Sequence, residues 1–367
     1  AGRGETKILI VGDPNQAIYG SLGGYAMPLD EFRAQAGIPI KEFALSLNYR
    51  SSERIISYFS NYSVHASKIT GAGKDAKFPS RITYNQKVTR SNVHDEIVRL
   101  IRKSLDNGYS PENICVLAPQ WVLLASTTRK LVAMLPDQQF DGPGLIPFSN
   151  NFDNFWFKVS KVLLTDSSPA LLIRRLRWAN EVIKDLDSFG VDTKTLTPRI
   201  LLRESNALTV NELDGLRYLD QAFTELLKRL NISPEIHPAL LTHREAFFSS
   251  SAARIERLQK EGATYINQIS VFKKVFRERS GITVSTIHGV KGAEFDVVIA
   301  FGLLEGMVPH FNEVNGHVAA SKLLYVLSSR ARKNLHLISE SERQRGRYSS
   351  YSATELLAAC IFNYDEE

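Results

Sequence analysis

The sequence has 367 residues, and 43% of them are hydrophobic, which is enough for two or three packed cores. No apolar run approaches the ~20 residues that span a bilayer, and no secretion signal opens the sequence, so we expect a soluble protein without a membrane partner. The two cysteines, Cys115 and Cys360, lie in apolar contexts. They argue against a disulfide framework or zinc site and favour a reducing, cytoplasmic location. The formal charge of +6 points only weakly to a polyanionic partner.

The first 60 residues alternate between strand-like and helix-like patterns. Residues 6–12 (TKILIVG) form a short apolar run closed by glycine, which is typical of a buried strand. Residues 28–36 have a helical pattern, and residues 41–46 predict a second short strand. In the segment NYRSS that follows, Ser51 or Ser52 is expected to cap the next helix.

A second α/β unit is expected to begin near Arg81. The polar stretch before it, residues 66–80, contains glycines and a proline and predicts a crossing between domains. Beyond it the pattern predicts a helix at 93–106, a strand at 114–119 and a helix at about 122–135. The alternation of strand and helix is typical of a parallel sheet.

The middle of the chain has a different character. From about residue 150 to 278, apolar residues recur at helical spacing without a strand pattern, which predicts a helical insertion. Strand patterns resume at 281–287, 296–302 and 334–339. The second α/β domain is therefore expected to be discontinuous in sequence.

Four segments carry a recognisable set of motifs. They are VGDPNQAIYG at 11–20, LNYRS at 47–51, ITVSTIHGVKGAEFDVVI at 282–299 with EGMVPH at 305–310, and LLYVLSSRARKNLHLI at 323–338. In this order they resemble the later motifs of UvrD/Rep/PcrA-like superfamily 1 DNA helicases. The string Thr-x-His-x-x-Lys-Gly-x-Glu-Phe in the third segment is the most specific of them.

The resemblance implies an α/β fold of a particular kind. We expect a RecA-like parallel sheet domain, formed by residues 81–149 and 279–367 and interrupted by a helical insertion at 150–278. Residues 1–80 are expected to be the C-terminal remnant of a first RecA-like domain.

The resemblance also assigns side chains to the nucleotide. Phosphoryl-transfer motors need positive charge aimed at the γ-phosphate and a side chain that senses it. In the family, the residues that match Gln16, Arg50 and Arg330 are the phosphate or water sensor, the γ-phosphate ligand and the arginine finger. A planar, permanently charged guanidinium suits the last two tasks. For Gln16, the alternative is an amide that satisfies the loop backbone.

Four further residues match ATP contacts of the family. The expected contacts are the adenine for Tyr49, the phosphates for Lys291 and Gly292, and the ribose for Glu294. ATP and Mg²⁺ are therefore the expected cofactors, although no metal ligand is expected within this sequence.

Single-stranded DNA is the partner that the resemblance implies. Tyr19 matches a base-stacking aromatic, and Thr286 and His288 match residues that contact the strand backbone. For His288, a structural hydrogen bond is the alternative. The stretch Gly20–Leu22 departs from the family pattern, which has a second aromatic and a second arginine there. Trp121 falls where the family has another DNA-contacting loop, but we expect it to pack in a core.

Two motifs that a nucleotide-driven motor needs are missing from the sequence. There is no G-x-x-x-x-G-K-[ST] phosphate loop, and the acidic pairs Asp30-Glu31 and Asp95-Glu96 fall in helical patterns and not at the end of an apolar strand. The nearest match, Gly71-Ala72-Gly73-Lys74-Asp75, lacks the required spacing and is interpreted as a flexible loop. In the family both motifs lie upstream of GDPNQ. We therefore expect a C-terminal part of a larger protein whose N-terminal RecA-like half is a further partner.

The sequence leaves two functional hypotheses. The first is part of an ATP-dependent, 3′-to-5′ single-stranded DNA translocase or helicase that is inactive alone. The second is a non-catalytic, helicase-like scaffold that binds DNA or a partner. The retained Gln16, Arg50 and Arg330 favour the first, because a scaffold has no need of γ-phosphate sensors.

Overall fold

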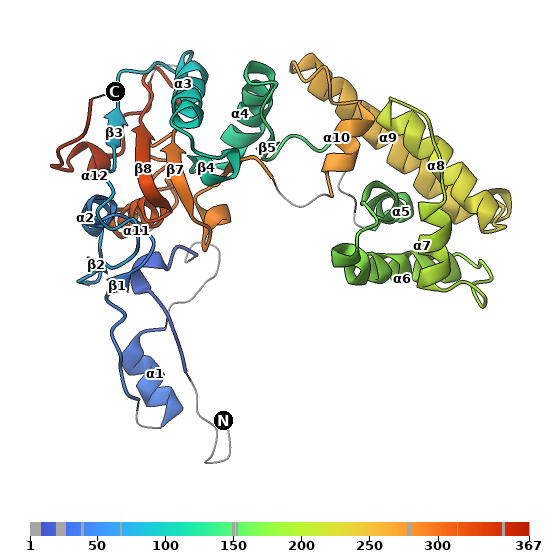
Figure 1. Cartoon of the computed structure of the whole chain (residues 1–367), viewed down its shortest axis with the longest axis horizontal. Coiled ribbons are helices and arrows are strands. Elements are labelled where there is room, and N and C mark those ends of the chain that lie inside the picture. Colours follow the sequence, from blue (N-terminus) through green and yellow to red (C-terminus); the bar gives the residue numbers. More distant parts are fainter. Residues whose placement is uncertain are drawn as a thin grey trace. The chain divides into compact units, whose positions relative to one another are not determined.

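The protein is a mixed α/β chain with a parallel sheet, as the alternating pattern predicts. Its backbone contacts divide it into two compact units, Ala1–Gly142 with Ser280–Glu367 and Pro143–Arg279 (Figure 1). We call them the sheet unit and the helical unit. The computed structural model describes residues 9–19, 27–37, 40–66, 68–148, 151, 153–276, 280–313, 315–346 and 349–366.

The sheet unit is built on six parallel strands among the described residues. Their order across the sheet is β3-β8-β7-β4-β6-β5, and each neighbouring pair is parallel. The central strand β4 is buried along its whole length, as expected where helices cover both faces of a parallel sheet. In chain order the strands are β3 (Ile82–Asn85), β4 (Ile114–Ala118), β5 (Phe140–Asp141), β6 (Ile282–Thr286), β7 (Phe295–Ala300) and β8 (Ala331–Ile338).

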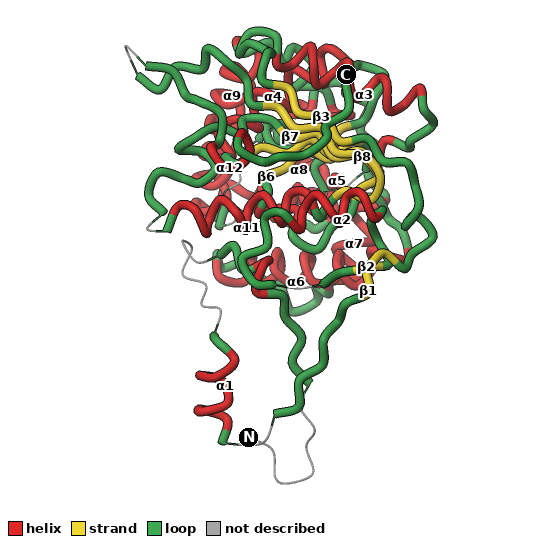
Figure 2. Tube along the Cα trace, turned by 90° about the vertical axis from the view of Figure 1, so that its left-hand side faces the viewer, coloured by secondary structure: helices red, strands yellow, loops and turns green. Residues whose placement is uncertain are grey.

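Helices cover the two faces of this sheet. Successive strand residues point to opposite faces, so β4 contributes to two cores. Ile114, Val116 and Ala118 pack with α3 (Val93–Asp106) and α4 (Trp121–Met134). The other face of the sheet packs against three helices (Figure 2). They are α2 (Glu53–Ser60), α11 (Gly316–Ser328) and the short helix α12 (Glu355–Ala358).

The predicted helices of the sheet unit are confirmed. Helix α1 (Leu29–Ala36) matches the prediction at 28–36 and ends at Gly37, whose φ of 62° is left-handed. Helix α2 is capped by Ser52, whose hydroxyl accepts a hydrogen bond from the Ile55 amide at 3.3 Å. Helices α3 and α4 lie within one residue of their predicted positions.

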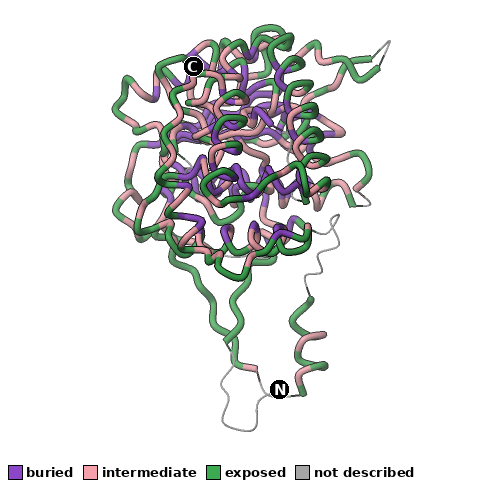
Figure 3. The backbone as a smooth tube through the Cα atoms, turned by 90° about the vertical axis from the view of Figure 1, so that its right-hand side faces the viewer, coloured by how far each residue is buried: buried purple, intermediate pink, exposed green. Residues whose placement is uncertain are grey.

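The prediction of strands at 6–12 and 41–46 is wrong for the residues that the structure describes. Residues 6–8 lie outside the described part of the chain, whereas residues 9–12 and 41–46 are described and are not in strands. Leu9 and Leu45 are 84% and 82% exposed (Figure 3 shows these segments as exposed). A strand requires a series of hydrogen bonds to a neighbouring strand. At the end of 41–46 the Ser46 carbonyl accepts from the Thr70 amide of β2 at 2.9 Å, but the residues before it have no strand partner among the described residues.

The stretch predicted as a domain crossing, residues 66–80, lies inside the sheet unit. It contains β2 (Thr70–Gly71), which pairs in parallel with β1 (Leu47–Asn48). The assignment of residues 1–80 to another domain stays a prediction.

The elements described in the helical unit are helices. Trp156 lies in their core, where it is 1% exposed and donates its indole N–H to the Leu240 carbonyl at 2.9 Å. None of the helices described anywhere in the chain is long and apolar enough to cross a bilayer. The helices of this unit are α5 (Phe155–Leu164), α6 (Leu172–Ser188), α7 (Pro198–Asn206), α8 (Gly215–Arg229), α9 (Pro238–Lys260) and α10 (Ile269–Lys274).

Candidate functional site

Arg330 lies at the centre of the predicted nucleotide residues. It follows α11 and is only 1% exposed, although it carries a charge. Its Nε donates to the Val326 carbonyl at 3.1 Å, and Nη1 donates to the Ala293 carbonyl at 3.2 Å. Its Nη2 donates to Gln16 Oε1 and to Ser329 Oγ, both at 3.0 Å. Arg330 therefore joins two motif segments that are 314 residues apart.

The electrostatic setting of Arg330 follows from this burial. Burial first, and then the positive charge of Arg50, lower the pKa of Arg330 to about 10, while Glu294 opposes the shift. The guanidinium is still a cation at neutral pH. Its burial is tolerated because its donors are hydrogen-bonded.

Arg50 approaches the same cluster from the loop after β1. Its Nε lies 2.5 Å from Glu294 Oε1, and its Nη1 donates to the Ser329 carbonyl at 3.1 Å. The loop is held by Asn48, whose side-chain oxygen accepts from the Arg50 amide at 2.8 Å. Ser51 Oγ also donates to the Ala331 carbonyl at 2.7 Å, which ties the loop to the start of β8.

Gln16 is positioned by the short 3₁₀ turn Pro14–Gln16. Its amide Nε2 donates to Asp13 Oδ2 at 2.6 Å, while its Oε1 accepts from Arg330. The turn is anchored by the buried Asn15, whose Oδ1 accepts from the amides of Val64 and His65 at 2.9 and 2.8 Å. Gln16 is thus held by side chains on both of its amide atoms.

Sequence reasoning missed three residues of this cluster: Asp13, Asn15 and Tyr325. Tyr325 lies on α11, and burial followed by the charge of Asp13 raises its pKa to about 12, while a hydrogen bond to Asn15 opposes the shift. Its ring meets Phe59 of α2 edge to face, with centroids 5.0 Å apart. The acid and amide in GDPNQ were a usable signal, since such side chains often hold turns.

Tyr49, the predicted adenine contact, is 68% exposed. The segment around Gly73, predicted to be flexible, packs on its backbone. A Cβ at Gly73 would lie 2.1 Å from the Tyr49 carbonyl oxygen, so no larger residue fits without a shift. The Ala72 amide also donates to the Asn48 carbonyl at 2.8 Å. This packing fixes the backbone of Tyr49 and leaves its ring facing solvent.

The predicted DNA contacts lie together beside the end of β6. Tyr19 donates its hydroxyl to the His288 carbonyl at 3.1 Å, and their ring centroids are 5.7 Å apart. His288 Nε2 lies 3.2 Å from the Ile18 carbonyl oxygen, which is the structural hydrogen bond considered as its alternative role. Thr286 Oγ1 accepts from the Gly289 amide at 3.0 Å.

Lys291 and Gly292 lie on the connection from β6 to β7. Lys291 Nζ is 4.9 Å from the centroid of the Tyr19 ring, a cation–π distance. Gly292 has a φ of 92°, which an L-residue rarely adopts. Lys291 is therefore closer to the predicted DNA contacts than its predicted phosphate role implies. The altered stretch Gly20–Leu22 lies outside the described residues.

The prediction that Trp121 packs in a core is wrong. Trp121 is the first residue of α4 and is 64% exposed. The buried face of α4 begins at Leu124, one turn later. Helical periodicity could not place Trp121, because the first turn of a helix can lie beyond the edge of the sheet that it covers.

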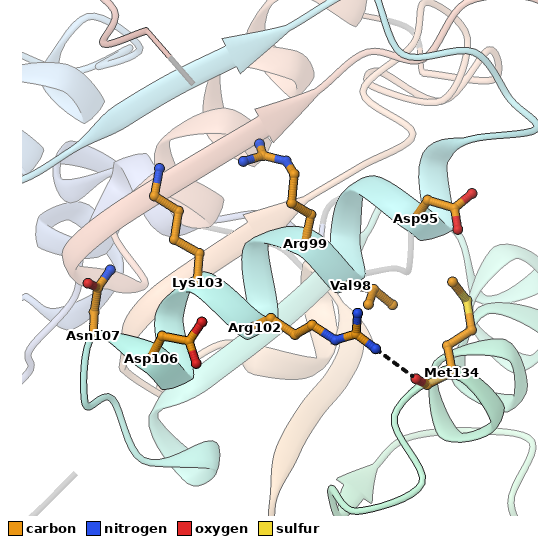
Figure 4. A pocket seen from close by; sticks show the side chains of 8 residues that line it. All are labelled: Asp95, Val98, Arg99, Arg102, Lys103, Asp106, Asn107 and Met134. Carbon is orange, nitrogen blue, oxygen red and sulfur yellow. Dashed lines mark hydrogen bonds between the residues drawn. The ribbon is translucent and has the colours of Figure 1, made fainter.

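A surface pocket on α3 is separate from this site. Arg102 crosses it and donates from Nη2 to the Met134 carbonyl at 3.5 Å (Figure 4). Acidic and basic side chains alternate around it, so it has no single sign of charge. The described residues also contain no cluster of three or more histidine, cysteine or acidic side chains that could hold a metal ion. The pocket is lined by Asp95, Val98, Arg99, Arg102, Lys103, Asp106, Asn107 and Met134.

The chain is similar to known helicases in the region that contains these motifs. Residues 250–342 match the family model of the UvrD-like helicase C-terminal domain, and this range includes the third and fourth motif segments. The chain is 24% identical to a probable DNA helicase II homolog of Mycoplasma pneumoniae, over 91% of this chain and 50% of that protein. It is 21% identical to the ATP-dependent DNA helicase PcrA of Staphylococcus aureus, over 92% of this chain and 52% of that protein. The chain thus spans about half the length of the curated relatives it matches.

Proposed function

Because the chain contains a UvrD-like helicase C-terminal domain and matches a C-terminal portion of helicases named DNA helicase II and PcrA, we propose that it completes an ATP-dependent single-stranded DNA translocase or helicase. The observation that carries this proposal is the cluster of Gln16, Arg50, Glu294 and Arg330. Segments from distant parts of the chain form two side-chain pairs, Gln16 with Arg330 and Arg50 with Glu294. The two pairs are joined where Arg50 donates to the carbonyl of Ser329, the residue before Arg330. A scaffold protein has no need to keep two guanidinium groups and an amide gathered in this way.

The two arginines take different roles in this proposal. Arg50 is the direct γ-phosphate ligand, because its side chain is 28% exposed and borders solvent. Arg330 is 1% exposed, so in this conformation it acts through Gln16, holding the amide that senses the phosphate. An arginine-finger role requires Arg330 to exchange internal acceptors for phosphate oxygens when nucleotide binds.

The other nucleotide contacts fit ATP to different degrees. The exposed ring of Tyr49 offers a face to adenine, and its backbone is already fixed. Glu294 is paired with Arg50, so a contact to the ribose competes with that ion pair. ATP would supply the phosphoryl group and Mg²⁺ would neutralise its charge. The residues described here hold and orient the far side of the nucleotide.

A phosphate-binding domain is the further component that this function needs. We infer that the exposed apolar segments 9–11 and 43–45 are the part of the sheet unit that meets such a domain. Leu9, Ile10 and Val11 are 84%, 62% and 69% exposed, and Phe43 and Leu45 are 71% and 82% exposed. Two apolar segments of this kind without neighbours fit strands that complete another sheet. The RecA-like architecture, the role of the helical unit as an insertion and the 3′-to-5′ polarity belong to the same proposal.

The test is ATP hydrolysis by a full-length protein that contains this chain, with and without single-stranded DNA. DNA-stimulated turnover is expected, and Arg50→Ala should lower kcat by at least about a hundredfold, by analogy with the loss of a phosphate-stabilising arginine. The matched control is Arg203→Ala, since Arg203 is 72% exposed in the helical unit and should be dispensable. The 367-residue chain alone is expected to show no turnover.

A full-length protein without nucleotide turnover that still binds DNA would favour the scaffold hypothesis. Near-normal turnover in Arg50→Ala would remove Arg50 from the phosphate role. Turnover by the purified 367-residue chain would contradict the need for a separate phosphate-binding domain.

A further inference from the structure

Asp13 is an acidic residue without an assigned role, next to the proposed phosphate sensor Gln16. Its backbone is extended, with φ −129° and ψ 110°, and its side chain caps the turn, because Oδ1 accepts from the Asn15 amide at 2.9 Å. Its Oδ2 accepts from Gln16 Nε2 at 2.6 Å, and its carbonyl accepts from the Gln16 backbone amide at 3.1 Å. Asp13 is exposed, yet both of its carboxylate oxygens are therefore engaged within the turn.

The amide of Gln16 has only one orientation that satisfies both of its partners. An ionised carboxylate only accepts hydrogen bonds, and a guanidinium only donates them. Asp13 therefore requires the NH₂ group of Gln16 on its side, whereas Arg330 Nη2, 3.0 Å from Oε1, requires the oxygen. Rotating the amide by half a turn would place acceptor against acceptor and donor against donor. The charges of the two partners thus decide which way the amide points.

Among the described contacts, these two leave Gln16 with one donor and one acceptor to spare. An amide NH₂ group has two N–H donors, and the amide oxygen has two lone pairs. Asp13 takes one donor and Arg330 takes one lone pair. The remaining N–H suits a γ-phosphate oxygen. The remaining lone pair suits a proton of the attacking water, which must be held in line with the bond that breaks.

We propose that Asp13 is a positioning residue for ATP hydrolysis, which fixes the Gln16 amide so that its spare donor and acceptor meet phosphate and water. This inference rests on the proposed function and adds a residue that acts only through Gln16. In the reaction, the water oxygen bonds to the γ-phosphorus while the bond to the ADP oxygen breaks, and the water protons end on inorganic phosphate. Without Asp13, the amide keeps only its contact to Arg330 and pivots about it. A misplaced amide slows this step without removing a nucleotide contact.

Asp13→Ser separates the two tasks of the carboxylate. A serine hydroxyl still caps the turn, but its single oxygen is one bond closer to the backbone and does not also reach Gln16. In the 367-residue chain labelled with ¹⁵N on its glutamine side chains, the carboxylate should shift one amide proton of Gln16 downfield, and Gln16→Ala identifies that resonance. In Asp13→Ser the proton should move upfield. The matched control is Asp30→Ser on α1, where the aspartate is 93% exposed, and it should leave the resonance unchanged.

Steady-state ATP hydrolysis by the full-length protein gives the second readout. Asp13→Ser should lower kcat about tenfold or more and change the KM for ATP less than about threefold, because the amide contact matters most in the transition state. In a Gln16→Ala background, Asp13→Ser should lower kcat by less than about twofold further, because Asp13 acts through Gln16 alone.

The outcomes separate this inference from the proposed function. An unchanged Gln16 resonance in Asp13→Ser, or losses in kcat that multiply in the double variant, would overturn the positioning role. Normal kcat in Asp13→Ser would also overturn it and leave the proposed roles of Arg50 and Arg330 standing. Absence of ATP turnover in the unmodified full-length protein would instead overturn the proposed function, and the Gln16 resonance would still decide whether Asp13 orients the amide.

Discussion

At the scale of single residues, Arg330 and Arg50 have different surroundings, although the motif pattern assigned both of them to the γ-phosphate of the nucleotide. Arg330 has internal acceptors on all three of its guanidinium nitrogens, whereas Arg50 borders solvent and pairs with Glu294. Burial is a property of the surrounding fold. The sequence therefore identified both residues without indicating which of them acts through a neighbour.

Arg330→Ala is expected to destabilise the protein as well as to change its activity. The substitution removes the side-chain donor of the Ala293 carbonyl and empties the space of a side chain that is 1% exposed, while the Val326 carbonyl keeps its bond from Ser329 Oγ. The loss should cost about 2–4 kcal/mol in the free energy of unfolding. Arg50→Ala removes a partly exposed ion pair and should cost less than about 1 kcal/mol. Urea denaturation of the two variants measures the difference. Equal losses would contradict the distinction between a buried positioning arginine and an exposed phosphate ligand.

At the residue level, the motif order grouped side chains that lie near one another in the fold, but it did not reveal residues whose positions depend on tertiary contacts. The motif order named Gln16, Arg50, Glu294 and Arg330, and the structure brings these four together. Asn15 and Tyr325 were missed because their partners lie far away in the sequence, whereas Asp13 bonds to its neighbours Asn15 and Gln16 and could have been found from the turn motif. The exposure of Trp121 was missed because periodicity does not reveal where a covering helix extends past its sheet.

At the scale of elements, the sheet shows which strands a sequence can reveal. The strands predicted at 114–119, 281–287, 296–302 and 334–339 correspond to β4, β6, β7 and β8, whose apolar residues are buried between helices. The patterns at 6–12 and 41–46 also contain apolar residues, although 41–46 includes Lys41 and Glu42. An apolar pattern predicts that a segment will be buried, but it does not say which domain supplies the neighbouring strand.

The pairing of β3 with β8 contains a pH-sensitive contact. His336 Nδ1 lies 2.9 Å from Thr83 Oγ1, and burial, aided by the charges of Lys103 and Arg81, lowers the pKa of His336 to about 4. The unfolded chain, with an ordinary histidine pKa near 6.5, binds the proton first as pH falls. The stabilising contribution is therefore complete above pH ~6.5 and is lost progressively towards pH ~4, by up to about 3 kcal/mol.

This dependence is measured by urea unfolding between pH 7 and pH 4.5. His336→Gln keeps a neutral hydrogen-bonding side chain and should flatten the fall in stability over that range. This flattening will be partial, because burial also lowers the pKa of His94 to about 4, so His94 contributes to the same fall in stability. The matched control is His317→Gln, on α11 outside this contact. An unchanged pH profile in His336→Gln would show that the histidine is already protonated in the folded protein or is not buried.

At the scale of the whole molecule, the two units have separate hydrophobic cores. Among the described residues, the core of the helical unit is formed by side chains between Ile146 and Phe276, including Trp156, whereas the sheet has cores of its own. Residues 143–279 are therefore expected to fold when expressed alone, with the helical circular dichroism and cooperative thermal unfolding of a small domain.

Tryptophan emission provides the readout for this expectation. In the Trp121→Phe chain, the remaining tryptophans, Trp156 and Trp178, both belong to the helical unit. Their unfolding transition in that chain should match the transition of the isolated fragment within about 1 kcal/mol. A fragment without a cooperative transition would mean that the helical unit needs the sheet unit to fold.

The ion pairs around Arg330 also determine how the site responds to an incoming anion. Two guanidinium groups, on Arg50 and Arg330, are matched by two carboxylates, on Asp13 and Glu294, so the cluster has no net charge. A neutral cluster exerts little long-range attraction on a triphosphate. Cations outside this cluster would then have to attract the nucleotide. When phosphate binds, Arg50 and Arg330 would exchange their carboxylate and carbonyl partners for phosphate oxygens. Under the proposed function, such a site would respond to bound phosphate and would contribute little to the initial affinity for nucleotide.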